Sequence, residues 1–336
     1  PLPMIASPHR ATPSIVAGLL TVLAASALSA APRAGDRVCL VSTRPVGVST
    51  EAATLSDGVY GAVYDGGWRD GDLGTALSSF DPALPVVFYV HGNRIDPCDA
   101  RSRGLAVYRR LVDCAGDERP FQFVIFSWCS SKEPGVLRDY RIKAARTRPV
   151  AWQLAWVIDR LPASSRVGLL GYSYGARVSS GAAHLLGGGA LSGLAYDESP
   201  DCTPCARPLR AVFLAAAMDA CWLGPQRYHG LALMRMESLL VTLDSRDPAM
   251  RCFRLVPRLS DPPALGDVGP RGLSADYAAK VRTLNVAPAV GRSHDLFRYL
   301  AAPGLMRSAW RRLTYADASI DAPTVASASR RARPGA

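Results

Sequence analysis

Short apolar segments alternate with longer amphipathic ones along most of the chain. Seven segments are rich in Val, Leu, Ile and Phe and are bounded by polar, Gly or Pro residues, as β-strands are. They are Val38–Ser42, Val86–Val90, Phe121–Trp128, Arg166–Leu170, Leu209–Leu214, Ser238–Leu243 and Val281–Val286. Several are almost continuously apolar, which indicates strands buried on both faces of a parallel sheet.

Helical segments occupy much of the sequence between these strands. We expect helices at Arg101–Cys114, Tyr140–Leu161, Ala176–Leu186, Asp295–Ala301 and Leu305–Leu313. Strands that alternate with helices predict an α/β fold, with a mostly parallel central sheet covered by helices on both faces. The Gly- and Asp-rich residues 57–74 predict turns or an irregular hairpin. The long connections 187–208 and 252–277 follow strands of the second half, where ligands bind in such sheets.

The two ends of the chain differ in composition from the rest. Residues 14–31 form an apolar run rich in Ala, Ser and Thr after a short polar leader, which predicts a signal peptide over residues 1–31. The alternative is an uncleaved membrane anchor. We expect one α/β domain over residues 32–316 and a disordered tail over residues 317–336. These features predict a secreted or periplasmic protein with no stable membrane insertion after cleavage of the signal.

The eight cysteines all follow the apolar run. An even number of cysteines in an exported chain predicts disulfide bonds. The lone CxxC motif has no second pair of metal ligands, so we expect no metal site. Cys221–Cys252 and Cys98–Cys129 are expected because the members of each pair follow neighbouring strands. Cys202–Cys205 fits a local bridge within the CxxC motif, and Cys39–Cys114 then remains by elimination.

The formal net charge of the 336 residues is +11, which raises the question of nucleic-acid binding. Only three of the 39 basic residues are lysines, and the arginines are scattered rather than clustered. A nucleic-acid-binding surface needs a basic patch or stripe, so we expect no nucleic-acid partner.

The segment Gly171-Tyr-Ser173-Tyr-Gly175 matches the pattern G-x-S-x-G between an expected strand and an expected helix. A sharp strand-to-helix turn needs glycine on both sides of the serine because the backbone is crowded there. Such a turn raises the serine hydroxyl above the sheet at a helix N-terminus. Ser173 is therefore a candidate nucleophile, with the Tyr174 N–H as a candidate oxyanion donor.

A serine needs a base, and the chain has only five histidines. His294 alone lies after every candidate acid, in a loop between the last strand and a helix. We expect it to be the base. The third member should be an acid that follows a strand between the serine and the histidine. Asp247 is preferred, Asp244 and then Asp219 being the alternatives.

The segment Val90-His91-Gly92-Asn93-Arg94 ends another buried strand. Glycine there lets the backbone approach a substrate carbonyl, so the N–H of Asn93 or Arg94 is a candidate second oxyanion donor. The side chain of Arg94 either lies at the mouth of the pocket, where it favours anionic or polar acyl groups, or is a surface arginine paired with Asp96.

These motifs resemble the α/β-hydrolase superfamily: VHGN at 90–93, GYSYG at 171–175, LDSRDP at 243–248 and RSHD at 292–295 occur in the order serine, acid, histidine. Phe126-Ser-Trp128 is similar to a bacterial branch of unassigned function, in which the strand end often reads Trp-Pro-Ser; here Cys129 replaces the proline. The resemblance covers roughly residues 36–316. It implies an acyl-enzyme mechanism but no particular substrate.

The sequence therefore predicts an exported serine hydrolase that cleaves a small-molecule or lipid carboxylic ester without a cofactor. Ser173, Asp247 and His294 are its expected catalytic residues, with Asn93 and Tyr174 at the oxyanion hole. An acyltransferase would use the same residues, and a non-catalytic binding module could keep the same fold. The sequence leaves the oligomeric state open.

Overall fold

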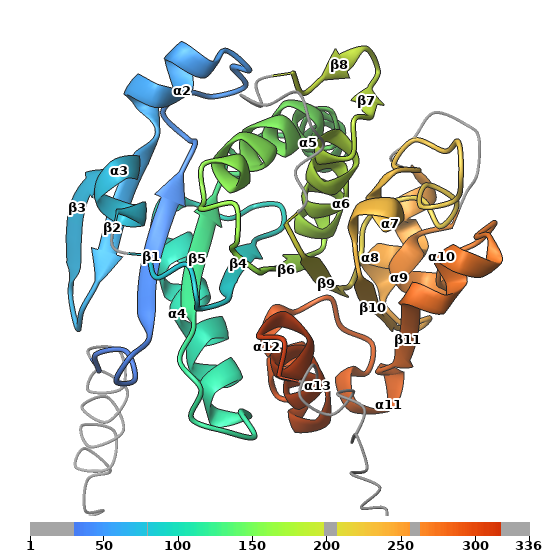
Figure 1. The fold of residues 1–336 in the computed structure, drawn as a ribbon. Coiled ribbons are helices and arrows are strands. Elements are labelled where there is room, and N and C mark those ends of the chain that lie inside the picture. Colours follow the sequence, from blue (N-terminus) through green and yellow to red (C-terminus); the bar gives the residue numbers. More distant parts are fainter. Residues whose placement is uncertain (1–29, 79, 198–206, 256–262, 317–336) are drawn as a thin grey trace, which may run out of the picture.

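The computed structural model in Figure 1 describes residues 30–78, 80–197, 207–255 and 263–316. Residues 1–29 of the expected signal peptide, the expected tail at 317–336, and Cys202 and Cys205 lie outside these ranges.

A nine-stranded sheet runs through the molecule, in the spatial order β11-β10-β9-β6-β4-β5-β1-β2-β3. All of its neighbouring strands pair in parallel except at one edge, where β2 pairs antiparallel with both β1 and β3. The strands are β1 (Arg37–Ser42), β2 (Tyr60–Tyr64), β3 (Trp68–Asp72), β4 (Val86–Val90), β5 (Gln122–Ser127), β6 (Val167–Tyr172), β9 (Leu209–Leu214), β10 (Ser238–Leu243) and β11 (Val281–Asn285). The short strands β7 (Ala190–Leu191) and β8 (Leu194–Ala195) form a separate antiparallel pair. The mostly parallel sheet predicted from the sequence is confirmed. Within the expected turn-rich segment 57–74, β2 and β3 form a regular antiparallel hairpin between the end of α2 and the start of α3.

Helices occupy the connections between the strands. The longer ones are α4 (Pro97–Asp113), α5 (Val136–Asp159), α6 (Tyr174–Leu186) and α13 (Pro303–Leu313). The shorter ones are α2 (Ala52–Gly58), α3 (Leu73–Leu77), α7 (Ala232–Arg235), α8 (Pro248–Arg251), a 3₁₀ turn (Cys252–Leu255), α9 (Leu265–Val268), α10 (Ala275–Lys280), α11 (Ala287–Val290) and α12 (Leu296–Leu300). Most of the shorter helices were not expected, because four to seven residues are too few to show helical periodicity. Among the described helices, none has the length and apolar character needed to cross a membrane.

The sheet separates two apolar clusters. One face packs against α5 and α6, and the other packs against α4, α12 and α13, as Figure 1 shows. Successive residues of a strand point to opposite faces, and β1 illustrates this: Cys39 and Val41 belong to the first cluster, whereas Val38 and Leu40 belong to the second. Burial on both faces explains why the strands are almost continuously apolar.

The cysteine pairing expected from the sequence is not present in the described residues. Cys39, Cys98, Cys114, Cys129, Cys221 and Cys252 are all free. Cys39 and Cys114 cannot meet because they lie in the clusters on opposite faces of the sheet. The thiol of Cys129 donates a hydrogen bond to the carbonyl of Arg44 (3.2 Å) rather than pairing with Cys98. Cys252 directly follows α8 and lines a cavity, and Cys221 is not among the residues that line it.

Candidate active site

The turn between β6 and α6 holds Ser173 in an unusual backbone conformation. Its φ of 54° lies in the left-handed region that non-glycine residues rarely adopt. A Cβ at Gly175 would lie 1.8 Å from the carbonyl oxygen of Val90, and one at Gly171 would lie 2.5 Å from the Cα of Ala176. Only glycine fits at either position, so the two glycines of the motif allow the sharp turn that the sequence predicted.

The structure brings Ser173, His294 and Asp247 together in one hydrogen-bonded chain. The Nε2 atom of His294 lies 3.0 Å from Ser173 Oγ, and its Nδ1 atom lies 2.6 Å from Asp247 Oδ2. With the proton on Nδ1, His294 donates to Asp247 and accepts from the serine hydroxyl. This arrangement can remove the proton from a serine as it attacks, and the buried carboxylate can stabilise the imidazolium that forms.

The carboxylate of Asp247 is fully buried and its two oxygens have separate partners. Oδ1 accepts from the backbone N–H groups of Ala249 (2.8 Å) and Met250 (3.3 Å), which fixes the carboxylate as the N-cap of α8. Oδ2 is thereby directed at His294. The two alternatives do not reach the histidine: Asp244 accepts from the N–H of Arg246, and Asp219 pairs through its backbone with Ala264.

The side chain of Tyr172 contacts both the backbone carbonyl and the ring of His294. Its hydroxyl donates to the carbonyl of His294, and the two rings lie 5.5 Å apart. Tyr172 is part of the motif at 171–175, but the sequence pattern carries no signal for this contact, because the two residues are far apart in the chain.

Three structural features identify the fold. The strained serine turn follows a strand near the middle of a parallel sheet, Asp247 follows β10, and His294 follows β11, in the chain order of serine, acid and histidine. The chain has the α/β-hydrolase fold. It departs from a wholly parallel sheet only at the β2–β3 hairpin.

Comparisons with known proteins find matches among solved structures. No protein-family model and no curated protein sequence matches the chain. Among solved structures, an inhibited esterase B from Lactobacillus rhamnosis aligns with 91% of this chain and 97% of its own, at 10% identity and a TM-score of 0.40. We draw nothing about activity from a match at this level.

Opposite the serine of this hydrolase fold, the loop after β4 is fixed by the buried ring of His91. Burial, together with the positive charge of Arg44, lowers the pKa of His91 to about 3, so the ring is neutral. Its Nε2 accepts from the N–H of Trp128 (3.2 Å), and its Nδ1 lies 3.0 Å from the carbonyl oxygen of Gly92. In the planar trans peptide that joins Gly92 to Asn93, the N–H points away from that carbonyl. His91 thus fixes which way the Asn93 N–H points.

The same loop lies directly against the serine. A Cβ on Gly92 would come within 3.0 Å of the Cβ of Ser173. The N–H of Arg94 already donates to the side-chain oxygen of Asn93 (2.8 Å), which leaves the Asn93 N–H as the candidate donor on this loop. Tyr174 is the first residue of α6, where backbone N–H groups have no partner inside the helix.

An apolar cavity of about 280 Å³ opens beside Ser173 and His294. Apart from these two residues, its walls are aliphatic or aromatic side chains and one thiol. They come from the start of α5, from α6, and from the segments after β9 and β10: Val136, Leu137, Tyr140, Tyr174, Ala217, Ala249, Met250, Cys252 and Phe253. Within the described ranges, no group of three or more His, Cys, Asp or Glu side chains is arranged to hold a metal ion.

The side chain of Arg94 pairs with Asp139, not with Asp96. Its Nε lies 2.8 Å from Asp139 Oδ2, whereas Asp96 is the N-cap of α4 and accepts from the N–H of Asp99. Arg94 is not among the residues that line the cavity. Sequence reasoning missed Asp139, because the expected helix began only at Tyr140 and an acidic residue next to a helix N-terminus reads as an ordinary helix-dipole contact.

Proposed function

We propose that this protein is a serine hydrolase that cleaves carboxylic esters through an acyl-enzyme. The observation that carries the proposal is the continuous chain of contacts from Ser173 through His294 to the buried Asp247, at the wall of an apolar cavity. A serine and histidine in contact, with a carboxylate on the far ring nitrogen, is the arrangement that activates a serine for acyl transfer.

In the proposed reaction, Ser173 Oγ attacks the ester carbonyl while His294 Nε2 takes its proton. The oxyanion that forms accepts hydrogen bonds from the N–H groups of Asn93 and Tyr174. The intermediate then expels the alcohol, which receives the proton from His294. Water attacks the acyl-enzyme in the same way, which releases the carboxylic acid and restores the serine.

The cavity indicates the chemistry of the acyl group. Its walls offer no charged side chain, and an engineered apolar cavity of about 150 Å³ is known to hold benzene. A cavity of nearly twice that volume therefore fits an uncharged acyl group of roughly six to ten carbon atoms. Transfer of the acyl group to an alcohol would use the same residues, and no contact of the described residues favours it over hydrolysis.

The experiment is a series of p-nitrophenyl esters, from acetate to palmitate, assayed with the wild-type protein and with Ser173→Ala as the blank. We expect kcat/KM to be highest for chains of roughly six to ten carbons and low for a half-ester of succinate. Wild-type turnover no greater than that of Ser173→Ala, for every ester, would contradict the proposal.

We also propose that the protein is exported. Because the six described cysteines are free, this proposal depends on the apolar run at residues 14–31 alone. Separation of the secreted, periplasmic, membrane and cytoplasmic fractions of cells that produce the full chain would test it.

A further inference from the structure

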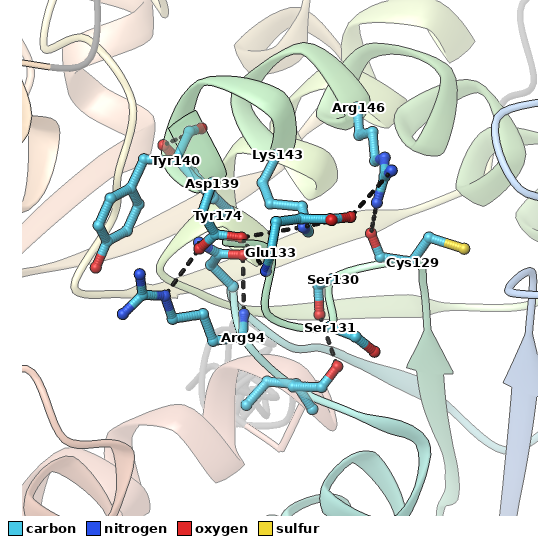
Figure 2. A network of polar contacts seen from close by, with 12 residues as sticks. Arg94, Cys129, Ser130, Ser131, Glu133, Asp139, Tyr140, Lys143, Arg146 and Tyr174 are labelled. Carbon is cyan, nitrogen blue, oxygen red and sulfur yellow. Dashed lines mark hydrogen bonds and ion pairs between the residues drawn. The ribbon is translucent and has the colours of Figure 1, made fainter. Parts of the chain in front are cut away.

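A buried carboxylate lies behind the proposed oxyanion loop and is not part of the triad. The side chain of Asp139, in the first turn of α5, is completely buried and has four hydrogen-bond donors around it (Figure 2). Oδ2 accepts from Asn93 Nδ2 (3.0 Å) and Arg94 Nε (2.8 Å), and Oδ1 accepts from the N–H of Glu133 (2.9 Å) and from Lys143 Nζ (3.1 Å).

Two of these donors come from adjacent residues of the loop after β4. Arg94 has a φ of 58°, a left-handed conformation that non-glycine residues avoid unless their surroundings hold them in it. Asp139 binds the side chain of this strained residue, Arg94, and that of the residue before it, Asn93. The backbone N–H that is proposed to meet the oxyanion belongs to Asn93, so one carboxylate anchors the residue that supplies it.

The next residue of the same helix reaches the second proposed donor. The carbonyl of Tyr140 accepts from the hydroxyl of Tyr174 (3.2 Å), and the two rings meet edge to face with centroids 6.4 Å apart. Arg94 lies over the ring of Tyr140, with its guanidinium carbon 5.1 Å from the ring centre. The start of α5 therefore contacts both residues whose N–H groups would form the oxyanion hole, Asn93 through Asp139 and Tyr174 through Tyr140.

We propose that Asp139 is a positioning residue that fixes the oxyanion hole by holding Asn93 and Arg94 in place. This inference rests on the proposed function and adds to it a residue that touches neither the substrate nor the reacting atoms. A donor helps only when it is aimed at the position that the oxyanion will occupy, so a small displacement of the loop lowers the rate of the chemical step.

The donors around Asp139 keep its carboxyl group ionised, as this role requires. Burial works to raise its pKa, but hydrogen bonds from Arg94, Glu133, Lys143 and Asn93 outweigh burial and lower the pKa to about 2. Asp139 therefore remains ionised across the neutral range. Lys143 is fully buried and pairs with Asp139 and, at 3.5 Å, with Glu133. Removing the charge of Asp139 leaves Lys143 with one ion-pair partner, so the variant is expected to lose stability as well.

The test compares Asp139→Asn with the wild-type protein per active site, the sites being counted by titration with a fluorophosphonate. We expect kcat to fall by roughly 10- to 100-fold while KM changes by less than about threefold. The inhibition constant of a trifluoromethyl ketone, which forms an oxyanion with the serine, should rise by the same factor as kcat/KM falls. If Asp139 had a purely structural role, the variant would have fewer active sites and a lower unfolding temperature, but kcat per site and the inhibition constant would not change.

Two further variants make the outcome decisive. Arg94→Met removes one contact to Asp139 but leaves the buried pair with Lys143 intact; it should lower kcat by roughly 3- to 10-fold in a folded protein. Asp159→Asn is the matched control, because Asp159 is a buried carboxylate at the other end of α5, paired with Arg207 (3.4 Å) away from the cavity. It should lower stability and leave kcat per site within about twofold of the wild-type value.

Unchanged kcat and inhibition constant per site in both Asp139→Asn and Arg94→Met would overturn the inference. Ser173→Ala distinguishes that result from failure of the proposed function. If Ser173→Ala is inactive while Asp139→Asn and Arg94→Met are normal, the hydrolase proposal stands and the proposed role of Asp139 is wrong. If Ser173→Ala is as active as the wild type, the proposed function itself is wrong.

Discussion

Two serines, one just before helix α6 and one within it, each contact a histidine from another part of the chain, and only one of these two pairs has the surroundings of a catalytic site. Ser173 precedes the helix and its Oγ lies 3.0 Å from His294 Nε2; Ser180 lies about two turns further on, with its Oγ 2.7 Å from His229 Nδ1. By distance alone, the second pair is the closer. The difference between them lies in what surrounds each histidine.

The first pair has a carboxylate behind the histidine and an open cavity in front of the serine. The second has neither: Ser180 and His229 are buried, and no carboxylate hydrogen-bonds to His229 within the described residues. Burial lowers the pKa of His229 well below its ordinary value, and the positive charge of Arg177 lowers it further. A ring whose pKa lies far below the working pH is a poor general base.

A short contact between serine and histidine is therefore not sufficient evidence of a nucleophile. The Ser173 pair combines contact with a buried anion, a strained turn and access to a cavity, whereas the Ser180 pair serves to satisfy buried polar atoms inside the core. The predictions below separate these two roles, beginning with the largest expected effect.

Replacing each serine by alanine should have opposite consequences. We expect Ser173→Ala to lower kcat for ester hydrolysis by about 10⁴- to 10⁶-fold in a folded protein, because no other group can form the acyl-enzyme. Ser180→Ala should leave kcat within about twofold of the wild-type value. Assays of both purified variants on the same ester test this. A large fall in kcat for Ser180→Ala would show that the buried pair takes part in the chemistry.

Removing the charge of the acid should affect only the first pair. Asp247→Asn is expected to lower kcat by about 10³- to 10⁴-fold, since the amide cannot hold the required tautomer of His294 or stabilise the imidazolium. Asp244→Asn and Asp219→Asn serve as controls, because neither carboxylate contacts His294, and each should change kcat by less than about fivefold. A greater loss in either control than in Asp247→Asn would show that a different acid supports the histidine.

Truncating the second histidine should affect folding rather than chemistry. His229→Ala opens a cavity in the core and removes the shortest hydrogen bond of Ser180, so we expect the free energy of unfolding to fall by roughly 2–4 kcal/mol in urea titrations. The value of kcat per titrated site should stay within about twofold of the wild-type value. His229→Phe keeps most of the ring volume and should lose less stability, which separates the cavity from the lost hydrogen bond.

The smallest expected effect concerns Asp219, which lies near Arg177 beside the second pair. Burial raises the pKa of Asp219 to about 6, although Arg177 and Trp222 act in the opposite direction. The folded protein therefore binds this proton more tightly than the unfolded chain does, so the stability contributed by this group falls as the pH rises from about 4 to 6. Asp219→Asn should melt about 2–4 °C higher than the wild type at pH 7–8 and at nearly the same temperature near pH 4. Thermal melts at several pH values test this, and a difference independent of pH would contradict it.

Local patterns in the sequence were enough to predict the sheet and the serine turn. The apolar runs mark the strands. Gly171 is needed because a side chain there would clash with Ala176 inside the turn, and Gly175 because one there would clash with distant Val90, but the local G-x-S-x-G pattern includes both glycines. The long helix was expected from Tyr140 but begins at Val136, because exposed apolar residues in its first turn hide the periodicity.

Features that depend on distant parts of the chain were not predictable in this way. Asp139 meets Asn93 across 46 positions, and nothing in the local sequence of either residue indicates the partner. The expected bridge between Cys39 and Cys114 was wrong because pairing by elimination does not reveal which face of the sheet a side chain occupies. The order of serine, acid and histidine selected three residues that the structure brings into contact, because that order reflects the connectivity of the fold rather than a local pattern.

The most direct test of the central claim is reaction of the wild-type protein with a fluorophosphonate, followed by mass-spectrometric mapping of the modified peptide. The account predicts one adduct, on Ser173, which is retained in Ser180→Ala and lost in Ser173→Ala and in His294→Gln. An adduct on Ser180 or another serine, or no adduct on a folded protein that hydrolyses esters, would contradict it.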